Sequence, residues 1–181
     1  MKKSFPNHAM RWSEVKRPIV CLAPMDGVTN SAYRQIVRSL NRDVFLFSEF
    51  TSVDGLVQNE FLRSRMDYNP CEHPFFMQLF GNSPEKFAEA SRMVEDRGIW
   101  GVDINMGCPS KKIVHSQHGS ALMKDTDTAC RIIESIRNAC KLEVSVKTRL
   151  GWTDHNNLIN FAKSLESAGA LMLTIHGRTY N

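Results

Sequence analysis

Six short apolar runs, separated by helical patterns, constrain the fold of this chain more than any other feature of its sequence. The runs are rich in Val, Ile, Leu and Phe, as buried strands are. They span residues 19–23, 44–48, 75–79, 101–105, 144–147 and 171–175. Strands that alternate in this way with helices predict a parallel α/β fold.

The segments between the runs have the spacing of amphipathic helices, with apolar residues at i, i+3, i+4 and i+7. Capping residues support these helices: Asn30 precedes the first, Ser83 and Pro84 open the third, and Gly169 follows the last. The apolar faces expected to pack on the core are Tyr33, Ile36, Val37 and Leu40; Val53, Leu56, Val57 and Phe61; Phe87, Ala90 and Val94; Ala129, Ile132, Ile133 and Ile136; and Leu158, Phe161, Ala162 and Leu165.

Two architectures fit this alternation, an open doubly wound sheet and a (β/α)8 TIM barrel. A doubly wound nucleotide fold concentrates glycines after its first strand, whereas here the first run continues as APMDGVTN, without GxGxxG. In a barrel, functional side chains gather at the carboxyl ends of several strands. Unusual residues stand at nearly every such end, namely Pro24-Met25-Asp26, Ser48-Glu49, Gln78, Asn105 with Cys108, Lys147 with Arg149, and His176 with Arg178. The barrel is therefore the predicted fold.

A complete barrel of this type needs about 250 residues, and this chain has 181. The sequence therefore predicts a barrel truncated after about six strands, in which residues 1–181 form one incomplete domain. Its first and last strands would be open edges with unpaired backbone groups. We expect the isolated chain to fold poorly or to aggregate, and cooperative unfolding of a monomer would contradict this expectation.

Composition narrows the protein class. The apolar fraction of 42% and the charged fraction of 23% are ordinary for a soluble globular protein. No apolar run is long enough to predict a membrane span, and the first residues lack the apolar segment of a secretory signal. The five cysteines form no CxxC pair, which indicates reduced thiols in a cytoplasmic protein. A net charge of +4 is compatible with a polyanionic partner but does not by itself indicate one.

Several reactive or charged residues are expected to have ordinary structural roles. Cys21, Cys130 and Cys140 fall on strand or helix patterns, where a small buried residue is expected. Arg34 and Arg38 are expected on the exposed side of the first helix. The histidines at 115 and 118 lack further ligands nearby, so no metal site is predicted.

The stretch 102–112 contains the clearest candidate for chemistry. A predicted strand ends at Asn105, the chain turns, and Cys108 begins a polar loop that also contains Lys111 and Lys112. A thiol that nothing perturbs is mostly protonated at neutral pH, so it can serve as a general acid toward a bound substrate. A nucleophilic cysteine would need an activating base, and the sequence assigns none. The two lysines flank this loop and are placed for phosphate contact.

Other strand-end residues offer polar groups to a ligand. Lys147 could stabilise negative charge on a reduced flavin or a phosphate, or it could extend into solvent. The amide of Gln78 can donate and accept hydrogen bonds together, which suits the edge of a flavin ring as well as a surface contact. His176 fits a ligand contact or a structural hydrogen bond equally well. Asn105 could bind the edge of a uracil base or cap the turn after its strand.

With these segments the chain resembles the tRNA-dihydrouridine synthases. The matching segments occur in the family's order and cover almost the whole chain after residue 18. They are APMDGVTNSAYR at 23–34, FFMQLFG at 75–81, DINMGCPSKK at 103–112, GSALMKD at 119–125, VSVKTRLGW at 144–152 and TIHGRT at 174–179. The combination of DINMGCP, KTRLG and HGRT is specific for the family.

The resemblance implies an FMN-binding barrel that reduces the C5–C6 bond of uridine in tRNA, with NADPH as reductant. In such enzymes the reduced flavin gives a hydride to C6, and a cysteine that corresponds to Cys108 protonates C5. The residues implied to bind the cofactor are Pro24, Met25, Asp26, Gln78, Lys147 and His176. The residues implied to bind the substrate are Asn105, Lys111, Lys112 and Arg178.

The resemblance also bears on the rest of the protein. The family's phosphate-binding segments after the sixth strand, and the C-terminal helical domain that grips tRNA, are expected to be absent from residues 1–181. The full-length protein is expected to be a cytoplasmic monomer without a metal ion.

Two alternatives stay open. One is another FMN barrel oxidoreductase, similar to dihydroorotate dehydrogenase, that acts on a free pyrimidine. The stretch KKIVHSQHGSALM and the segment HGRT favour the tRNA enzyme over it. The other is an inactive RNA-binding remnant that keeps the basic loop but binds no flavin. Flavin absorbance in the purified protein would separate this remnant from both enzymes.

Overall fold

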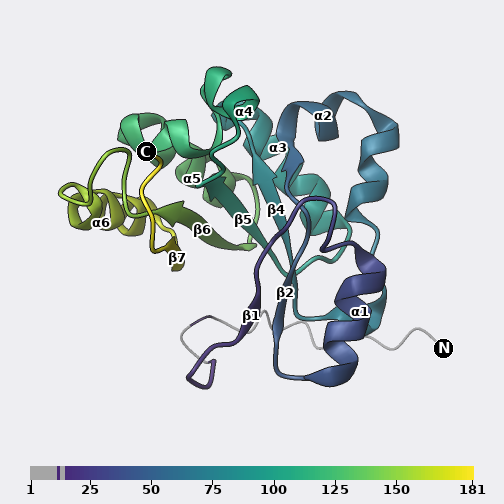
Figure 1. The fold of residues 1–181 in the computed structure, drawn as a ribbon. Helices are drawn as coiled ribbons and strands as arrows, with labels where there is room; N and C mark the ends of the chain where they lie inside the picture. The colour runs from purple at the N-terminus through teal and green to yellow at the C-terminus, as the bar shows by residue number, and fades with distance from the viewer. Residues whose placement is uncertain (1–11, 13–14) are drawn as a thin grey trace.

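A curved parallel sheet forms the centre of the computed structural model, which describes Trp12 and residues 15–181. The strand order is β1-β2-β4-β5-β6-β7, and the short strand β3 pairs beside the end of β4. Helices lie along the outer side of the sheet (Figure 1). These six strands form an incomplete (β/α)8 barrel, a half-barrel, and confirm the prediction of a truncated barrel over a doubly wound fold.

All six predicted strands are present. The strands are β1 (Cys21–Leu22), β2 (Phe45–Phe47), β3 (Thr51–Ser52), β4 (Phe75–Phe80), β5 (Gly101–Met106), β6 (Glu143–Arg149) and β7 (Met172–His176). The sequence did not predict β3, which has only two residues and continues directly into a helix. The edge strand β1 contains only two of the five residues of its apolar run.

The helices follow the strands as expected for a barrel. They are α1 (Ser31–Leu40), α2 (Val53–Gln58), α3 (Pro84–Asp96), α4 (Lys111–His115), α5 (Thr126–Ala139) and α6 (Leu158–Ala168), with 3-10 segments η2 (Glu60–Met66), η3 (Pro70–Glu72) and η4 (Gly119–Lys124). The predicted caps are confirmed. Asn30 accepts from the backbone N–H of Tyr33, Ser83 accepts from that of Lys86, and Gly169 ends α6 with a φ of 110°.

The two faces of the sheet have different surroundings. On the outer face, Met77, Ile104 and Val146 are fully buried against the helices. The predicted core faces of α3 and α5 are confirmed, since Phe87, Ala90, Val94, Ala129, Ile132, Ile133 and Ile136 are all fully buried. The apolar periodicity of the strands and of these two helices therefore predicted this part of the core correctly.

The side chains on the inner face of the sheet change from aromatic to polar along the strands. Near the amino ends it is aromatic: Trp12 lies 4.9 Å from the rings of both Phe45 and Phe76. Further along the same face of β4 and β5, because side chains alternate along a strand, Gln78, Asp103 and Asn105 follow, and all three are buried. The aromatic side chains therefore lie toward the amino end of the half-barrel, and the polar groups lie toward its carboxyl end.

Helix α1 contradicts its predicted orientation. Ile36 is 59% exposed and Leu40 is 83% exposed, whereas Arg34 and Arg38 are buried. The arginines face η3: Arg34 pairs with Glu72 at 2.5 Å, and Arg38 donates to the backbone oxygen of Glu72 at 3.1 Å. A buried carboxylate therefore decides which face of α1 is covered, and periodicity alone could not reveal it.

Two further expectations are wrong. Phe61, expected on the buried face of the second helix, is 82% exposed, because α2 ends at Gln58 and η2 follows with a different period. Cys21 is exposed because β1 is an edge strand, whereas Cys130 and Cys140 are half-buried and pack against the core. Among the residues that the structure describes, no helix is both long and apolar enough to cross a membrane.

Candidate active site

A cavity of about 190 Å³ opens at the carboxyl end of the half-barrel. It brings together predicted residues that lie far apart in the sequence. Pro24 follows β1, Gln78 lies on β4, and Asn105 lies on β5. Cys108 follows β5, while Lys147 and His176 come from β6 and β7. Predicted residues from the ends of five strands thus converge on one cavity.

The other predicted residues lie outside this cavity. Met25 and Asp26 are exposed on the loop after β1, and Lys111 and Lys112 are exposed on α4. Arg178 lines a neighbouring cavity of about 520 Å³, which shares Pro109 and Arg149 with the first. The structure therefore brings together six of the predicted residues in one cavity. The predicted phosphate-binding residues Lys111 and Lys112 lie outside it.

A chain of hydrogen bonds connects the inner face to the cavity. Gln78 Nε2 donates to Asp103 Oδ2 at 2.6 Å, and Asn105 Nδ2 donates to Gln78 Oε1 at 3.0 Å. Asn105 Oδ1 in turn accepts from the backbone N–H groups of Gly107 and Cys108 at 3.1 and 2.9 Å. Asn105 therefore caps the turn after β5, which is one of the two roles predicted for it.

The loop of Cys108 is also held from two other directions. The backbone oxygen of Cys108 accepts from the amide of Ser120 at 3.2 Å and from its hydroxyl at 2.9 Å. Arg149 Nε donates to the backbone oxygen of Gly107 at 2.6 Å. The thiol is half-buried and lines the cavity. Such a backbone holds the thiol in a defined position, which proton transfer to a bound substrate requires.

Gly119 packs directly against this loop, and its replacement by alanine is expected to disturb it. Its φ is +60°, and an added Cβ would lie 2.9 Å from Ile113 Cγ2 and 3.0 Å from the oxygen of Cys108. We expect Gly119→Ala to lower the free energy of unfolding by about 1 kcal/mol or more, measured by urea denaturation. Gly177→Ala is the control, since nothing lies within 4 Å of its added Cβ. Equal stability of both variants would contradict this account of Gly119.

The electrostatics of the cavity favour an anionic or electron-rich ligand. Burial lowers the pKa of the half-buried Lys147 ammonium, while the charge of Asp103 opposes this shift and that of Arg149 adds to it. The pKa of His176 is also lowered, first by partial desolvation and then by the neighbouring cations Arg149, Lys147 and Arg178. A ligand that brings negative charge would relieve this crowding of cations.

Asp103 is expected to make stability depend on pH. Burial raises its pKa from 3.8 to about 6, although hydrogen bonds from Ser145 and Gln78 and the charge of Lys147 oppose the shift. The folded state therefore favours the protonated acid, and this stabilisation is complete below pH 4 and is lost as the pH rises through about 6. As the pH rises from 4 through about 6, the free energy of unfolding of wild-type protein should fall by on the order of 3 kcal/mol relative to that of Asp103→Asn. Urea denaturation of both proteins across this range measures the difference, and parallel pH profiles would contradict it.

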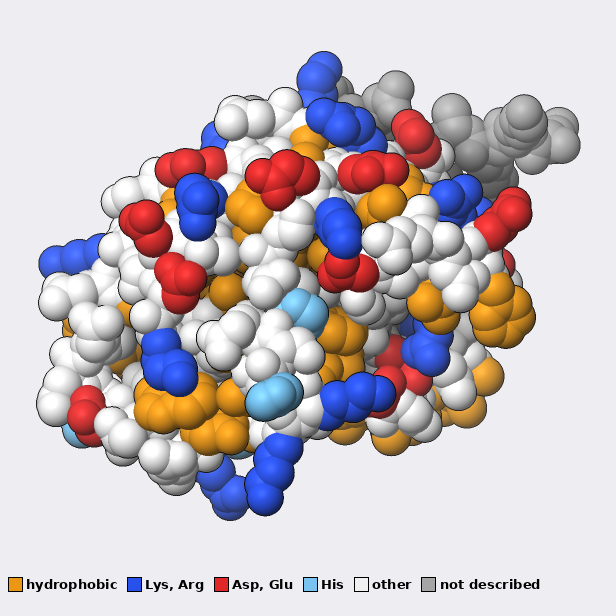
Figure 2. Space-filling model, turned by 90° about the horizontal axis from the view of Figure 1, so that it is seen from above, with side chains coloured by type: hydrophobic (Ala, Val, Ile, Leu, Met, Phe, Trp, Pro, Cys, Tyr) orange, Lys and Arg blue, Asp and Glu red, His pale blue; other side chains and the backbone are white. Residues whose placement is uncertain are grey.

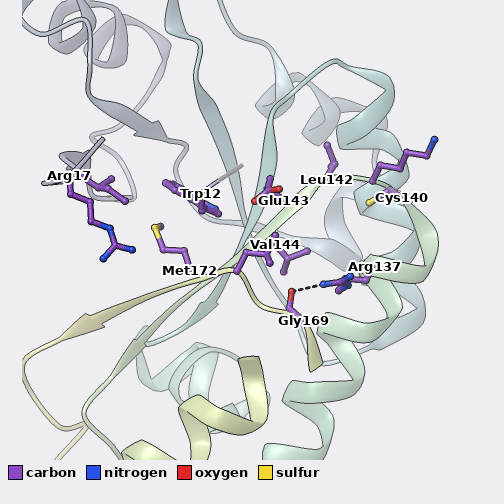
Figure 3. Close-up of a pocket in the computed structure, with 12 residues that line it drawn as sticks. Trp12, Arg17, Arg137, Cys140, Leu142, Glu143, Val144, Gly169 and Met172 are labelled. Carbon is purple, nitrogen blue, oxygen red and sulfur yellow. Dashed lines mark hydrogen bonds between the residues drawn. The ribbon is translucent and has the colours of Figure 1, made fainter. Parts of the chain in front are cut away.

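A larger cavity, of about 810 Å³, lies at the opposite end of the sheet (Figure 3). Val144 and Met172 line it near the starts of β6 and β7, together with Trp12, and Arg137 donates to the oxygen of Gly169 at its side. None of the predicted site residues lines it. Since functional groups of barrels gather at the carboxyl ends of strands, the smaller cavity is the better candidate in spite of its size.

Three residues at or beside the cavity had no predicted role, namely Asp103, Arg149 and Phe50. Asp103 lies two positions before Asn105 and therefore on the same face of β5, which is the signal that could have revealed it. Arg149 was noted beside Lys147 among the residues at strand ends, but it was assigned no role. It lies two positions after Lys147 on the inner face of β6, and it lines the cavity. Phe50 also lines the cavity, but it follows β2 in an irregular segment, and no pattern in the sequence indicated it.

The surface around the carboxyl ends carries charges of both signs. Figure 2 shows the molecule from the side on which α4 projects at the top of Figure 1. Lysine and arginine side chains project at the lower edge, the left edge and the top of this view, and acidic groups lie among basic ones in its upper part. Within the described part of the chain, no cluster of His, Cys, Asp or Glu could hold a metal ion.

Comparison with known proteins gives a consistent result. A family model described as "Dihydrouridine synthase (Dus)" matches residues 21–181. The chain is 39% identical over 161 residues to a probable tRNA-dihydrouridine synthase 1 of Synechocystis sp., which covers 88% of this chain and 45% of that relative. It is 35% identical over 182 aligned positions to a probable tRNA-dihydrouridine synthase of Staphylococcus aureus, with 99% of this chain and 53% of the relative covered. A probable tRNA-dihydrouridine synthase of Rickettsia conorii is 38% identical over 162 residues, which are 88% of this chain and 49% of that protein. The chain thus spans about half the length of these relatives.

Proposed function

Since this chain belongs to the dihydrouridine synthase family, we propose that the protein reduces uridine in tRNA to 5,6-dihydrouridine, with FMN as cofactor and NADPH as reductant. In this proposal Cys108 is the proton donor, and the six-stranded wall is part of the catalytic domain. One observation carries the proposal: Pro24, Gln78, Asn105, Cys108, Lys147 and His176 line a single cavity at the carboxyl end of the half-barrel.

The groups at this cavity fit a flavin. Gln78 uses one N–H and one lone pair of its amide for Asp103 and Asn105, which leaves one donor and one acceptor for the ring. Lys147 offers a cation that negative charge on the ring would attract. A volume of about 190 Å³ accommodates one edge of a flat ring rather than a whole cofactor. When bound, FMN supplies the hydride chemistry that no side chain provides.

Cys108 holds the proton in this scheme. Its thiol lines the same cavity as Gln78 and Lys147, and the hydrogen bonds of the loop restrict its position. A positioned thiol gives its proton to the substrate carbon as negative charge develops there. Lys147 and Arg149 line the same cavity, and we propose that their positive charges offset the negative charge left on the sulfur.

Asn105 is restricted to one kind of contact with a base. Both lone pairs of Oδ1 are used by the amides of Gly107 and Cys108, and one N–H is used by Gln78. The remaining N–H can only donate, so we propose that it binds a carbonyl oxygen of the uracil ring. The target base must leave its stack to reach this depth.

The exposed basic groups around the cavity suit the remainder of a tRNA. Lys111 and Lys112 lie on α4 directly after the cysteine loop, and Arg178 lies on the neighbouring cavity. Contacts of this type bind phosphates through charge and carry little base specificity. We propose that these three residues bind tRNA phosphates in a cytoplasmic enzyme. Pro24, Met25 and Asp26 are proposed to border the flavin through their backbone, and His176 through its ring.

The direct test uses the protein as the cell makes it. The purified protein should be yellow with a flavin spectrum, and it should form dihydrouridine in unmodified tRNA when NADPH is supplied, detected by mass spectrometry of nucleosides. Reduction of a free pyrimidine in place of tRNA would support the dihydroorotate dehydrogenase-like alternative. Protein that binds tRNA without flavin would support the inactive remnant.

A further inference from the structure

The carboxylate of Asp103 is the one group in the hydrogen-bond chain that does not line the cavity. It lies in the middle of β5 with 1% of its surface exposed, and it stands beside Gln78 of β4 and Ser145 of β6 in the register of the sheet. It accepts from Gln78 Nε2 and from Ser145 Oγ, both at 2.6 Å. A buried carboxylate is costly to the fold, so a function is a reasonable explanation for it.

The chemistry of a carboxylate gives the chain of hydrogen bonds a direction. An ionised carboxylate accepts only, so Gln78 must turn its NH2 group toward Asp103. Gln78 Oε1 is then left to accept from Asn105 Nδ2. Asn105 can therefore present only its oxygen to the turn, where two backbone N–H groups need an acceptor.

The opposite direction would leave several buried groups without partners. If the amide of Gln78 were rotated, its NH2 group would face the NH2 group of Asn105. Rotation of Asn105 as well would point its NH2 group at the amides of Gly107 and Cys108, which are donors themselves. Buried donors without acceptors are strongly unfavourable, and the turn that carries the thiol would open.

We propose that Asp103 is a positioning residue, which acts through Gln78 and Asn105 to set the position of the Cys108 loop and to leave one N–H of Asn105 available to the substrate. The burial of the carboxylate raises its pKa to about 6, so at neutral pH the group is still mainly in the accept-only form that this role needs. The part of the proposal that concerns substrate rests on the proposed function, whereas the part that concerns the loop does not.

The position of the loop can be tested without any enzymatic assay. In the natural protein, the rate at which iodoacetamide alkylates Cys108 is compared with the rate for Cys71, by mass spectrometry of peptides. Cys71 is exposed on η3 and lies outside the cavity, so it is an internal reference. Asp103→Leu removes the acceptor at similar size, and we expect Cys108 to react about fivefold faster or more, as loss of one anchoring hydrogen bond implies.

Three further variants separate the direction of the hydrogen bonds from other effects. Asp103→Asn keeps an oxygen for Gln78 and turns its NH2 group toward the hydroxyl of Ser145, so Cys108 should react within about twofold of wild type. Ser145→Ala removes the other partner of Asp103 and should also leave Cys108 unchanged. Gln78→Met interrupts the chain without changing Asp103, and it should reproduce the faster reaction even if Asp103→Leu does not fold.

Each outcome decides the proposal. Unchanged alkylation of Cys108 in both Asp103→Leu and Gln78→Met would overturn it, and so would a fast reaction in Asp103→Asn. In the assay on tRNA, Asp103→Leu should keep its flavin and lose at least about tenfold in kcat, and Asp103→Asn should restore it. Wild-type protein without activity on tRNA would contradict the proposed function alone, because the alkylation result stands independently.

Discussion

Replacing Cys108 by alanine is expected to reduce dihydrouridine formation by about 10²- to 10⁴-fold, the contribution typical of a general acid. The protein should keep its flavin, because the thiol is one lining group among several and the loop is held by backbone atoms. Product is measured by mass spectrometry of tRNA nucleosides, and flavin by absorbance. The loss should appear mainly in kcat, since the proton is needed in the chemical step rather than in binding.

Two other cysteine variants make this test specific. Cys71→Ala changes an exposed thiol outside the cavity and should leave activity unchanged. Cys108→Ser keeps the size of the side chain but replaces the thiol with a much weaker acid, so it should be almost as inactive as alanine. Product formation by Cys108→Ala at the wild-type rate would remove the proton-donor assignment.

Of the substitutions considered for stability, Glu72→Gln is expected to lower the free energy of unfolding most. Glu72 is fully buried and pairs with Arg34 at 2.5 Å. Its carboxylate also accepts hydrogen bonds from the hydroxyl of Ser31 and from the backbone N–H of Asn69. Glutamine would leave the guanidinium of Arg34 buried without a counter-charge. Removal of one partner of a buried pair typically costs about 3–5 kcal/mol, a large part of the stability of an ordinary domain. Urea denaturation of the natural protein measures this loss.

An exposed ion pair provides the control for this variant. Arg97 pairs with Asp67 at 2.5 Å, but these side chains are 46% and 64% exposed. Asp67→Asn should therefore cost at most about 1 kcal/mol. If Glu72→Gln lowered the free energy of unfolding no more than Asp67→Asn does, the Arg34–Glu72 pair would not hold α1 against η3. The exposure of Ile36 and Leu40 on α1 would then need another explanation.

The sequence was most informative where neighbouring residues decide the outcome. Strand runs, helix caps and the core faces of α3 and α5 follow from local periods and local hydrogen bonds, and they were predicted correctly. The barrel, too, could be inferred, because polar residues stand at the ends of successive strands. In a parallel sheet these ends lie at one edge, so the sequence alone predicts that Gln78, Cys108 and Lys147 lie close together.

Contacts between distant parts of the chain limited the prediction. Arg34 and Arg38 had the pattern of an exposed face, and only the position of Glu72 in η3 buries them. In the same way, Asp103 became part of the site only through Gln78 of a neighbouring strand. The spacing along β5 places Asp103 on the same face as Asn105, but the hydrogen bond to Gln78 and the contact of Glu72 with α1 join different elements and are not visible in that spacing.

The sequence by itself determined the elements, their order and the end of the sheet at which the chemistry lies. These depend on periodicity and on the common direction of parallel strands. Only the tertiary structure decided which polar groups are buried together and in which direction their hydrogen bonds run. The physical reason is that a buried charge is tolerated only beside its partners, and those partners come from other strands and helices.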